Sequence, residues 1–244
     1  EFWKTLDEVG RESLLRQIAN LDLDAVTRCH DLLKTEHDEH VVSIESTPVC
    51  MLAGDDRIQA FQHGEQSIRK GNVGVIVVAG GQGSRLGFEG PKGAFKIGPV
   101  SDASLFQIHA HKILALEQKY SAEVPFYIMT SLANDADTRR FFDRHDFFGL
   151  SRERVHFFTQ GMWPALTGDG RIILDRPDHV FMSPDGHGGI VCAMKREGIL
   201  SDMKTRGLQT VYYFQVDNPM VDIADPVFIG FHEMNDADIS VKVC

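Results

Sequence analysis

One short stretch of the 244-residue chain constrains its fold more than any other, because an apolar run leads directly into a glycine-rich loop. Residues 75–79 are Val, Ile, Val, Val and Ala, a composition typical of a strand buried on both faces. Glycines then recur from Gly80 to Gly93. Such a turn after a buried strand lets main-chain N–H groups approach an anion closely. The pattern therefore predicts a phosphate-binding loop at the end of a central strand.

Strand and helix patterns alternate after this loop. We expect helices over 104–120, 134–145, 189–196 and 225–234, strands over 125–130, 155–159, 210–216 and 238–243, and a small hairpin over 166–182. Alternation at this spacing predicts βαβ units and an α/β fold with a mixed, mostly parallel sheet. Residues 1–70 are instead charge-rich with apolar residues at helical spacing, including a short helix over 60–70. They predict an N-terminal helical arm packed on an α/β domain of residues 71–244.

The charge balance argues against a nucleic-acid partner. The chain has 35 acidic and 25 basic side chains, and the basic ones form no block of the kind that phosphate backbones require. No apolar run approaches the ~18 residues of a membrane span, and the N-terminus has no signal-peptide pattern. We therefore expect a soluble, cytoplasmic protein without nucleic-acid or membrane partners, and leave its oligomeric state open. Four widely spaced cysteines favour reduced thiols over a zinc site or disulfides: Cys29, Cys50, Cys192 and Cys244.

The glycine loop matches neither of the two best-known phosphate loops. The dinucleotide pattern G-x-G-x-x-G meets Leu86 where its third glycine belongs, and the Walker pattern fails because Lys92 is followed by Gly93. Arg85 and Lys92 nevertheless flank the glycines, and two cations at such a loop suit a triphosphate. The competing interpretation is a tight connection that binds no ligand. The abundance of glycine and the two cations favour the phosphate site.

Residues 78–87, followed by Pro91, Lys92 and Gly93, resemble the nucleotide-binding signature of the UDP-sugar pyrophosphorylases. Within that family they are most similar to the eukaryotic-type UDP-N-acetylhexosamine pyrophosphorylases. The similarity continues in the same order through further segments at 104–108, 127–131, 157–162, 184–189, 216–218 and 224–231. It therefore covers about residues 70–244, and the set is far more specific than any single motif.

The resemblance implies a Rossmann-like nucleotidyltransferase domain of the GT-A type. It implies a uridylyltransferase that joins UTP and a sugar 1-phosphate, here N-acetylglucosamine 1-phosphate, with Mg²⁺ as cofactor. Residue by residue, it implies that the nucleotide is held by Val78, Ala79, Gly80 and Gly81, its phosphates by Lys92, its uracil by Gln160 and Gly186, and the metal by Asp217. Arg85 and Lys92 are the expected catalytic cations. His187 stands where the family commonly has an Asn that contacts the substrate, which weakens the assignment of the sugar.

Elementary chemistry agrees with these roles but leaves alternatives open. Gln160 follows an expected strand, where ligands gather in open α/β sheets, and its amide can both donate and accept. A Gln that follows a strand is, about as often, exposed to solvent or caps the end of a neighbouring element without binding a ligand. Asp217 also follows a strand and offers the hard oxygen that Mg²⁺ prefers, although an Asp there can instead cap a helix. The alternative functions are a UDP-glucose or broad-specificity pyrophosphorylase and an inactive nucleotide-binding module.

The remaining histidines and aromatic residues carry no clear catalytic pattern. His37 and His40 lack a partner motif and are expected at a solvated surface, whereas His109 and His111 lie two apart in a helix and do not share a face. A cluster of phenylalanines predicts core packing: Phe141, Phe142, Phe147 and Phe148. No nucleophile elbow or reactive cysteine context is present, so covalent catalysis is not indicated. Because the chain begins without Met and ends within an expected strand, we expect the whole protein to be longer.

Overall fold

The fold was analysed in a computed structural model that describes residues 2–34 and 54–242. The chain divides into two compact units, which are described separately. Unit 1 comprises Glu1–Cys50 and Met162–Asp185, and unit 2 comprises Met51–Gly161 and Gly186–Cys244. This division differs from the expected boundary at residue 70, because the helix that ends at Arg69 packs within unit 2 and residues 162–185 lie with unit 1.

Unit 2 is built on a four-stranded parallel sheet. Its strands are β1 (Val73–Val78), β2 (Phe126–Thr130), β3 (Val155–Thr159) and β8 (Thr210–Gln215), in the order β3-β2-β1-β8. Ile76 of the central strand β1 pairs with Tyr127 on one side and Tyr213 on the other. All three pairings are parallel, which confirms the α/β prediction and brings the carboxyl ends of the four strands to one edge.

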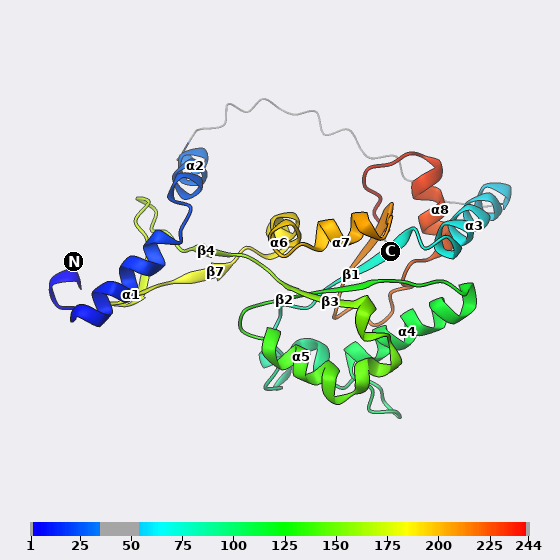
Figure 1. The fold of residues 1–244 in the computed structure, drawn as a ribbon, viewed down its shortest axis with the longest axis horizontal. Helices are drawn as coiled ribbons and strands as arrows, with labels where there is room; N and C mark the ends of the chain where they lie inside the picture. The colour runs from blue at the N-terminus through cyan, green and yellow to red at the C-terminus, as the bar shows by residue number, and fades with distance from the viewer. Residues whose placement is uncertain (1, 35–53, 243–244) are drawn as a thin grey trace. The chain divides into compact units, whose positions relative to one another are not determined.

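Helices cover both faces of this sheet, as Figure 1 shows. They are α3 (Gly54–Arg69), α4 (Leu105–Tyr120), α5 (Asp135–Arg144), α6 (Ile190–Arg196), α7 (Ile199–Thr205) and α8 (Pro226–Met234). Alternate strand residues point to opposite faces, so Val75 and Val77 join a core with α4 and α5, and Ile76 joins a second core with α6 and α7. The expected helices at 104–120, 134–145, 189–196 and 225–234 are all confirmed, whereas α7 was not expected.

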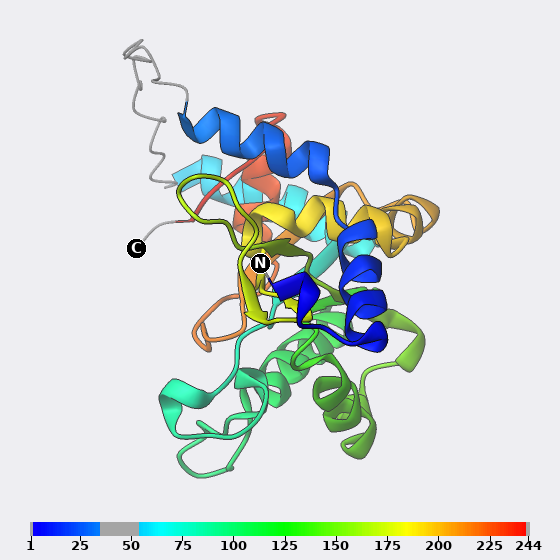
Figure 2. The same cartoon turned by 90° about the vertical axis from the view of Figure 1, so that its left-hand side faces the viewer.

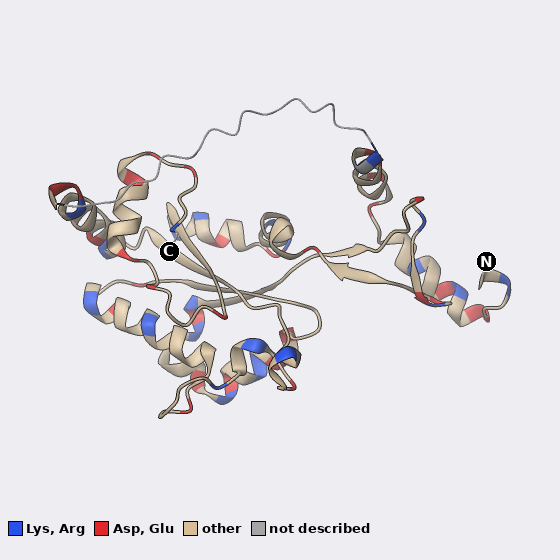
Figure 3. Cartoon of the chain, turned by 180° about the vertical axis from the view of Figure 1, so that it is seen from behind, with Lys and Arg blue, Asp and Glu red and all other residues tan. Residues whose placement is uncertain are grey.

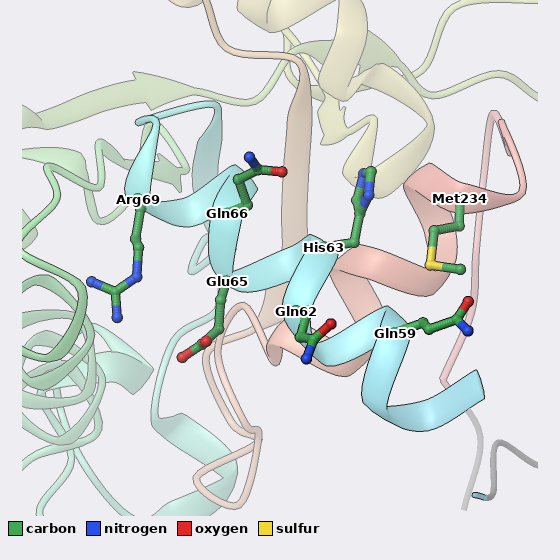
Figure 4. A pocket seen from close by; sticks show the side chains of 7 residues that line it. All are labelled: Gln59, Gln62, His63, Glu65, Gln66, Arg69 and Met234. Carbon is green, nitrogen blue, oxygen red and sulfur yellow. The ribbon is translucent and has the colours of Figure 1, made fainter. Parts of the chain in front are cut away.

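Helices α3 and α8 lie side by side (Figures 1 and 2) because two glycines let their backbones touch. A Cβ on Gly64 would lie 1.9 Å from the Pro226 carbonyl oxygen, and one on Gly230 would lie 1.8 Å from that of Ala60. Glu233 joins this helix pair to the amino end of β8, since its Oε1 accepts hydrogen bonds from Ser67 and Thr210, each at 2.7 Å. Next to Glu233, the outer face of α3 forms a polar hollow (Figure 4), which is lined by Gln59, Gln62, His63, Glu65, Gln66, Arg69 and Met234.

Unit 1 combines short helices with two small antiparallel sheets. Its helices are α1 (Glu8–Ala19) and α2 (Leu23–Lys34), and its strands are β4 (Met162–Pro164), β5 (Leu174–Arg176), β6 (His179–Val180) and β7 (Met182–Pro184). β5 pairs with β6, β4 pairs with β7, and Leu166 bridges Ile172 around the turn. These pairings confirm the hairpin expected at 166–182. Gln17 of α1 fastens the helix to it by donating to the Asp178 carbonyl and accepting from the Val180 N–H.

Short 3₁₀ turns complete the described chain: η1 (Phe2–Lys4), η2 (Ser84–Leu86), η3 (Lys92–Ala94), η4 (Asp146–Gly149), η5 (Arg152–Arg154) and η6 (Gly186–Gly189). The strand expected over 238–243 is wrong for residues 238–242. Ile239 and Val241 have the alternation of a strand, but the segment pairs with no strand of the sheet and both side chains are exposed. Four residues with sequence-based predictions lie outside the described residues: His37, His40, Cys50 and Cys244.

Buried phenylalanine rings in unit 2 match the sequence-based expectation of core packing. Phe142, Phe147 and Phe148 are buried in the core that α4 shares with the sheet, which confirms their packing role. α5 carries both acidic and basic side chains (Figure 3), and Arg139 pairs with Asp135 at 2.7 Å. A search of the helices in the described ranges found none with both the length and the apolar character needed to cross a bilayer.

Candidate nucleotide site

The candidate site lies at the carboxyl edge of the parallel sheet. Ala79 follows β1, Ser131 follows β2, Gln160 follows β3 and Val216 follows β8. Main-chain bonds extend the pairing one residue past the strands, since Ala79 N donates to Met129 O at 2.8 Å and Gln160 N donates to Thr130 O at 2.9 Å. Open parallel sheets bind ligands at this edge. The fold therefore brings the segments expected to hold a nucleotide to one place.

Residues 79–93, here called the first glycine loop, leave β1 as a tightly folded segment. Gly83 N donates to Gly90 O at 2.9 Å, and Lys92 N donates to Gly81 O at 3.0 Å, so the loop returns to its own start. A Cβ on Gly80 would lie 2.9 Å from the Gln160 Nε2 atom, so the Gln160 amide rests against the bare backbone of Gly80. Glycine permits this approach because it has no Cβ, and this explains why the first glycine of the loop, Gly80, is a glycine.

Lys92 and Asp217 meet although 125 residues separate them in the sequence. The Lys92 Nζ atom lies 2.5 Å from Asp217 Oδ2, and both side chains are partly exposed to solvent. The hydrogen bond from the Lys92 ammonium holds the pKa of Asp217 below its usual range. The site therefore presents an ionised carboxylate and an ammonium group at the end of β8, next to a glycine loop.

Asn134 fixes the first glycine loop from behind and was not predicted from the sequence. Its side chain is 1% exposed and donates to Ala79 O at 2.9 Å and Gly81 O at 3.1 Å. Its Oδ1 accepts from Ser131 N at 2.9 Å, so one amide ties the end of β2 to the loop after β1. An Asn before a helix predicts a cap by type, and this cross-strand role depends on the fold.

His109 and Lys112 hold the segment after β8 and were also missed. The buried His109 Nε2 donates to Val216 O at 2.8 Å, and burial lowers the pKa of His109 to about 4. Lys112 Nζ donates to the main-chain carbonyls of Pro219 at 2.6 Å and Val221 at 2.7 Å. No role was predicted for His109 from the sequence, because it does not share a helix face with His111. Its hydrogen-bond partner is the main-chain carbonyl of Val216, directly after β8.

Residues 186–189, here called the second glycine loop, are more exposed. Gly186 adopts a φ of +59°, which favours glycine, and begins the 3₁₀ turn η6. His187 is exposed, and its Nδ1 is hydrogen-bonded to the hydroxyl of Tyr213 on β8. The two rings meet edge-on at 5.9 Å between centroids. The structure therefore places His187 over β8 and gives it a side-chain partner that the sequence did not predict.

Arg85 forms no hydrogen bond or ion pair with the other predicted site residues, all of which lie in the described part of the chain. It lies exposed on η2, and within residues 2–34 and 54–242 it has no ion pair or hydrogen bond. The predicted residues thus separate into a contacting set and an isolated one. Gly80 contacts Gln160 and Lys92 contacts Asp217, whereas Arg85 stands apart on the loop.

The donor set at Asp217 fits a magnesium ion that shares its ligands with phosphate. The described residues contain no group of three or more His, Cys, Asp or Glu that could enclose a metal. Mg²⁺ commonly binds through one or two carboxylates, with phosphate oxygens and water completing its coordination. A single ionised Asp217 beside a glycine loop matches that pattern, and is a poor match for an ion that needs an all-protein cage.

The parallel four-stranded sheet with helices on both faces is an α/β fold of the nucleotidyltransferase type. The model of the UTP–glucose-1-phosphate uridylyltransferase family matches residues 26–244, and the chain belongs to this family.

Individual relatives within this family show which of its members the chain is similar to. UDP-N-acetylglucosamine diphosphorylase 1 of Arabidopsis thaliana is 37% identical over 99% of this chain and 51% of its own length. UDP-N-acetylglucosamine pyrophosphorylase of Saccharomyces cerevisiae is 44% identical over 98% of this chain and 54% of its own. A crystal structure of the uridine diphosphate N-acetylglucosamine pyrophosphorylase from Trypanosoma brucei matches with a TM-score of 0.80 at 30% identity, over 95% of this chain and 50% of that one. The chain thus spans about half the length of these relatives.

Proposed function

We propose that the chain carries the UTP-binding part of an enzyme that transfers a uridylyl group to a sugar 1-phosphate, yielding a UDP-sugar and pyrophosphate. The observation that carries this proposal is the Lys92–Asp217 contact at 2.5 Å, formed where β8 ends and the first glycine loop returns. A cation and a carboxylate at the mouth of a glycine loop suit a magnesium-bound polyphosphate. The named relatives, which are 37% and 44% identical to the chain over the aligned residues, make N-acetylglucosamine 1-phosphate the proposed acceptor.

The reaction needs positioning and charge neutralisation more than acid–base chemistry. A phosphate oxygen of the sugar 1-phosphate attacks the α-phosphorus of UTP in line. The new P–O bond replaces the bond to the bridging oxygen, and that oxygen leaves with its electron pair as part of pyrophosphate. Because the nucleophile is already an anion, no general base is required. Groups that hold the phosphates and neutralise developing charge therefore supply the rate enhancement.

Each proposed role rests on the resemblance to the UDP-sugar pyrophosphorylases and agrees with where the residue lies. The backbone of residues 78–81 and the ammonium group of Lys92 hold the phosphates, and Gln160 and Gly186 contact the uracil. Asp217 is the proposed ligand of Mg²⁺, which, when bound, neutralises phosphate charge. Arg85 is exposed and unpaired in the described part of the chain, so it remains available to an incoming phosphate. His187 is the proposed contact to the sugar.

The sugar is the least constrained part of the proposal. The matching family model is described by glucose 1-phosphate rather than by an N-acetyl sugar. An imidazole at position 187 differs from an amide in size and in hydrogen bonding. UDP-glucose synthesis, or use of several sugar phosphates, is therefore the second candidate.

A pyrophosphate-release assay on the full-length protein tests both candidates. UTP and Mg²⁺ are combined in turn with N-acetylglucosamine 1-phosphate, glucose 1-phosphate and galactose 1-phosphate, with ATP replacing UTP as the control. We expect the fastest release with UTP and N-acetylglucosamine 1-phosphate. If UTP raises the melting temperature but no acceptor yields pyrophosphate, the protein is a nucleotide-binding module and the proposal fails.

The proposed setting is the cytoplasm, where UTP and sugar phosphates are available, without a nucleic-acid or membrane partner. These points stay predictions from composition.

A further inference from the structure

One helix, α4, contacts the main chain next to both partners of the Lys92–Asp217 ion pair. On the lysine side, Gly93 lies flat against the ring of Phe106, since a Cβ there would come within 2.3 Å of ring carbons. Leu105 N also donates to Phe95 O at 3.1 Å. The first turn of α4 therefore supports the short 3₁₀ turn that carries Lys92.

On the carboxylate side, α4 supplies three hydrogen bonds to the segment 216–221. His109 donates to Val216 O at 2.8 Å, one residue before Asp217, and Lys112 donates to Pro219 O at 2.6 Å and Val221 O at 2.7 Å. His109 and Lys112 are three residues apart and share one side of the helix with Phe106. The residues flanking Asp217 are thus held on both sides by one rigid element.

The segment has few bonds of its own that would replace these. After Val216 N donates to Val78 O at 3.1 Å, the segment leaves the sheet. Its internal main-chain bonds are turn bonds, from Asn218 N to Gln215 O at 3.1 Å and from Val221 N to Asn218 O at 3.5 Å. Since a turn of this kind does not by itself fix a side chain relative to another strand, the α4 contacts determine where Asp217 lies.

An apolar side chain would stabilise the core more than either His109 or Lys112 does. His109 is 0% exposed, and its Nδ1 has no partner in the described part of the chain. Lys112 is partly buried, and desolvation lowers its pKa. A buried polar group without all its hydrogen bonds is destabilising compared with an apolar side chain of similar volume. The hydrogen bonds of His109 and Lys112 instead fix the positions of three main-chain carbonyl groups, those of Val216, Pro219 and Val221.

We propose that His109 and Lys112 are positioning residues, which hold the segment 216–221 so that Asp217 faces Lys92 at the proposed magnesium–phosphate site. This inference rests on the proposed function, because it assigns Asp217 a metal and Lys92 a phosphate. Both residues act through the main chain of the segment.

The test uses the full-length protein with two disruptive and two conservative variants. Lys112→Met and His109→Leu remove the donors, whereas Lys112→Arg and His109→Gln keep one. Lys119→Met is the matched control, because it removes the same charge from the same helix at a lysine that lies over the rings of Phe61 and Tyr120. Amide hydrogen exchange of residues 214–224 is measured together with Mn²⁺ binding, by paramagnetic resonance, in the presence of UTP and absence of acceptor.

We expect Lys112→Met to speed exchange in this segment severalfold and to weaken Mn²⁺ binding roughly tenfold, with Lys112→Arg and Lys119→Met near wild type. His109→Leu should act in the same direction, and His109→Gln should restore most of the loss. Unchanged exchange in Lys112→Met overturns the inference. Faster exchange with unchanged Mn²⁺ binding also overturns it, since the contacts would then be structural only.

Failure of the proposed function gives a different result. In that case wild-type protein releases no pyrophosphate with any acceptor, while the exchange and Mn²⁺ measurements still decide whether α4 positions Asp217.

Discussion

The two glycine loops of unit 2 differ in how they are supported. The first glycine loop rests on buried side chains, because Asn134 binds two of its carbonyls and the Gln160 amide lies against Gly80. The second glycine loop is exposed at His187 and Gly188, and Gly189 begins α6 without a side-chain cap. Rigid support suits groups that must stabilise charge on phosphates, since their contribution depends on preorganisation. The exposed His187 side chain suits a contact that chooses among sugars, whereas Gly186 of the same loop is the proposed contact to the uracil.

The strongest test of this contrast is Lys92→Met, which keeps the length of the side chain and removes its charge. We expect kcat/KM for UTP to fall roughly 10²- to 10³-fold, because a cation placed on developing phosphate charge is worth a few kcal/mol. Steady-state pyrophosphate release measures it. Lys96→Met is the control, since Lys96 is exposed on the segment that follows and pairs only with the exposed Asp102 at 3.7 Å. Equal losses in the two variants would remove Lys92 from the site.

Asn134→Leu tests the buried support directly. The substitution leaves the Ala79 and Gly81 carbonyls and the Ser131 N–H without their partner. Unsatisfied buried groups of this kind destabilise by about 1–3 kcal/mol each, so we expect a loss of roughly 3 kcal/mol in the free energy of unfolding.

Urea denaturation of the full-length protein measures this loss. Asn235→Leu is the matched control, because Asn235 is exposed and its amide bonds only the carbonyl of Phe231. We expect it to change stability by less than about 0.5 kcal/mol. A comparably small effect of Asn134→Leu would mean that the first glycine loop does not depend on this contact.

The buried His109 predicts a pH dependence on the supported side of the site. Burial lowers its pKa from 6.5 to about 4 in the folded protein. The stability associated with neutral His109 is therefore complete above pH 6.5 and is lost as the pH falls towards 4, because the unfolded chain binds a proton first. Between pH 7 and pH 5 we expect wild type to lose about 2 kcal/mol more than His109→Gln.

Urea denaturation at the two pH values measures that difference. His156, whose pKa burial also lowers, is present in both proteins and its contribution cancels. Parallel pH profiles for wild type and His109→Gln would show that His109 is not held neutral.

Local patterns predicted the strands and helices of unit 2 well because each has a strong signal of its own. The apolar run at 75–79 became the central strand, and strands ending before Gln160 and Asp217 brought these residues to one edge. Of the two cations expected at the loop, Lys92 contacts Asp217, whereas within the described residues Arg85 makes no such contact. Parallel topology therefore predicts which loops meet, and side-chain direction decides which residues touch.

The supporting residues escaped prediction for the opposite reason. Asn134, His109 and Lys112 act on main-chain carbonyls of distant segments, and a carbonyl group has no sequence signature. The strand predicted at 238–243 failed similarly, since the alternation of Ile239 and Val241 meets no pairing strand in the described sheet. Strand propensity measures how well a residue suits a pleated, half-buried surface, and it does not tell whether a neighbouring strand is present to pair with.

The smallest expected effect belongs to the second glycine loop. His187→Asn exchanges an exposed imidazole, hydrogen-bonded to Tyr213, for an amide that still donates and accepts. We expect KM for UTP to change less than about threefold, while the ratio of kcat/KM for N-acetylglucosamine 1-phosphate to that for glucose 1-phosphate shifts roughly tenfold, as one altered polar contact allows. Tyr213→Phe, which removes the hydroxyl that meets His187, should shift the same ratio in a smaller degree. A larger change in KM for UTP than for either sugar would assign His187, like Gly186, to the nucleotide, and the proposed contact of His187 to the sugar would fail.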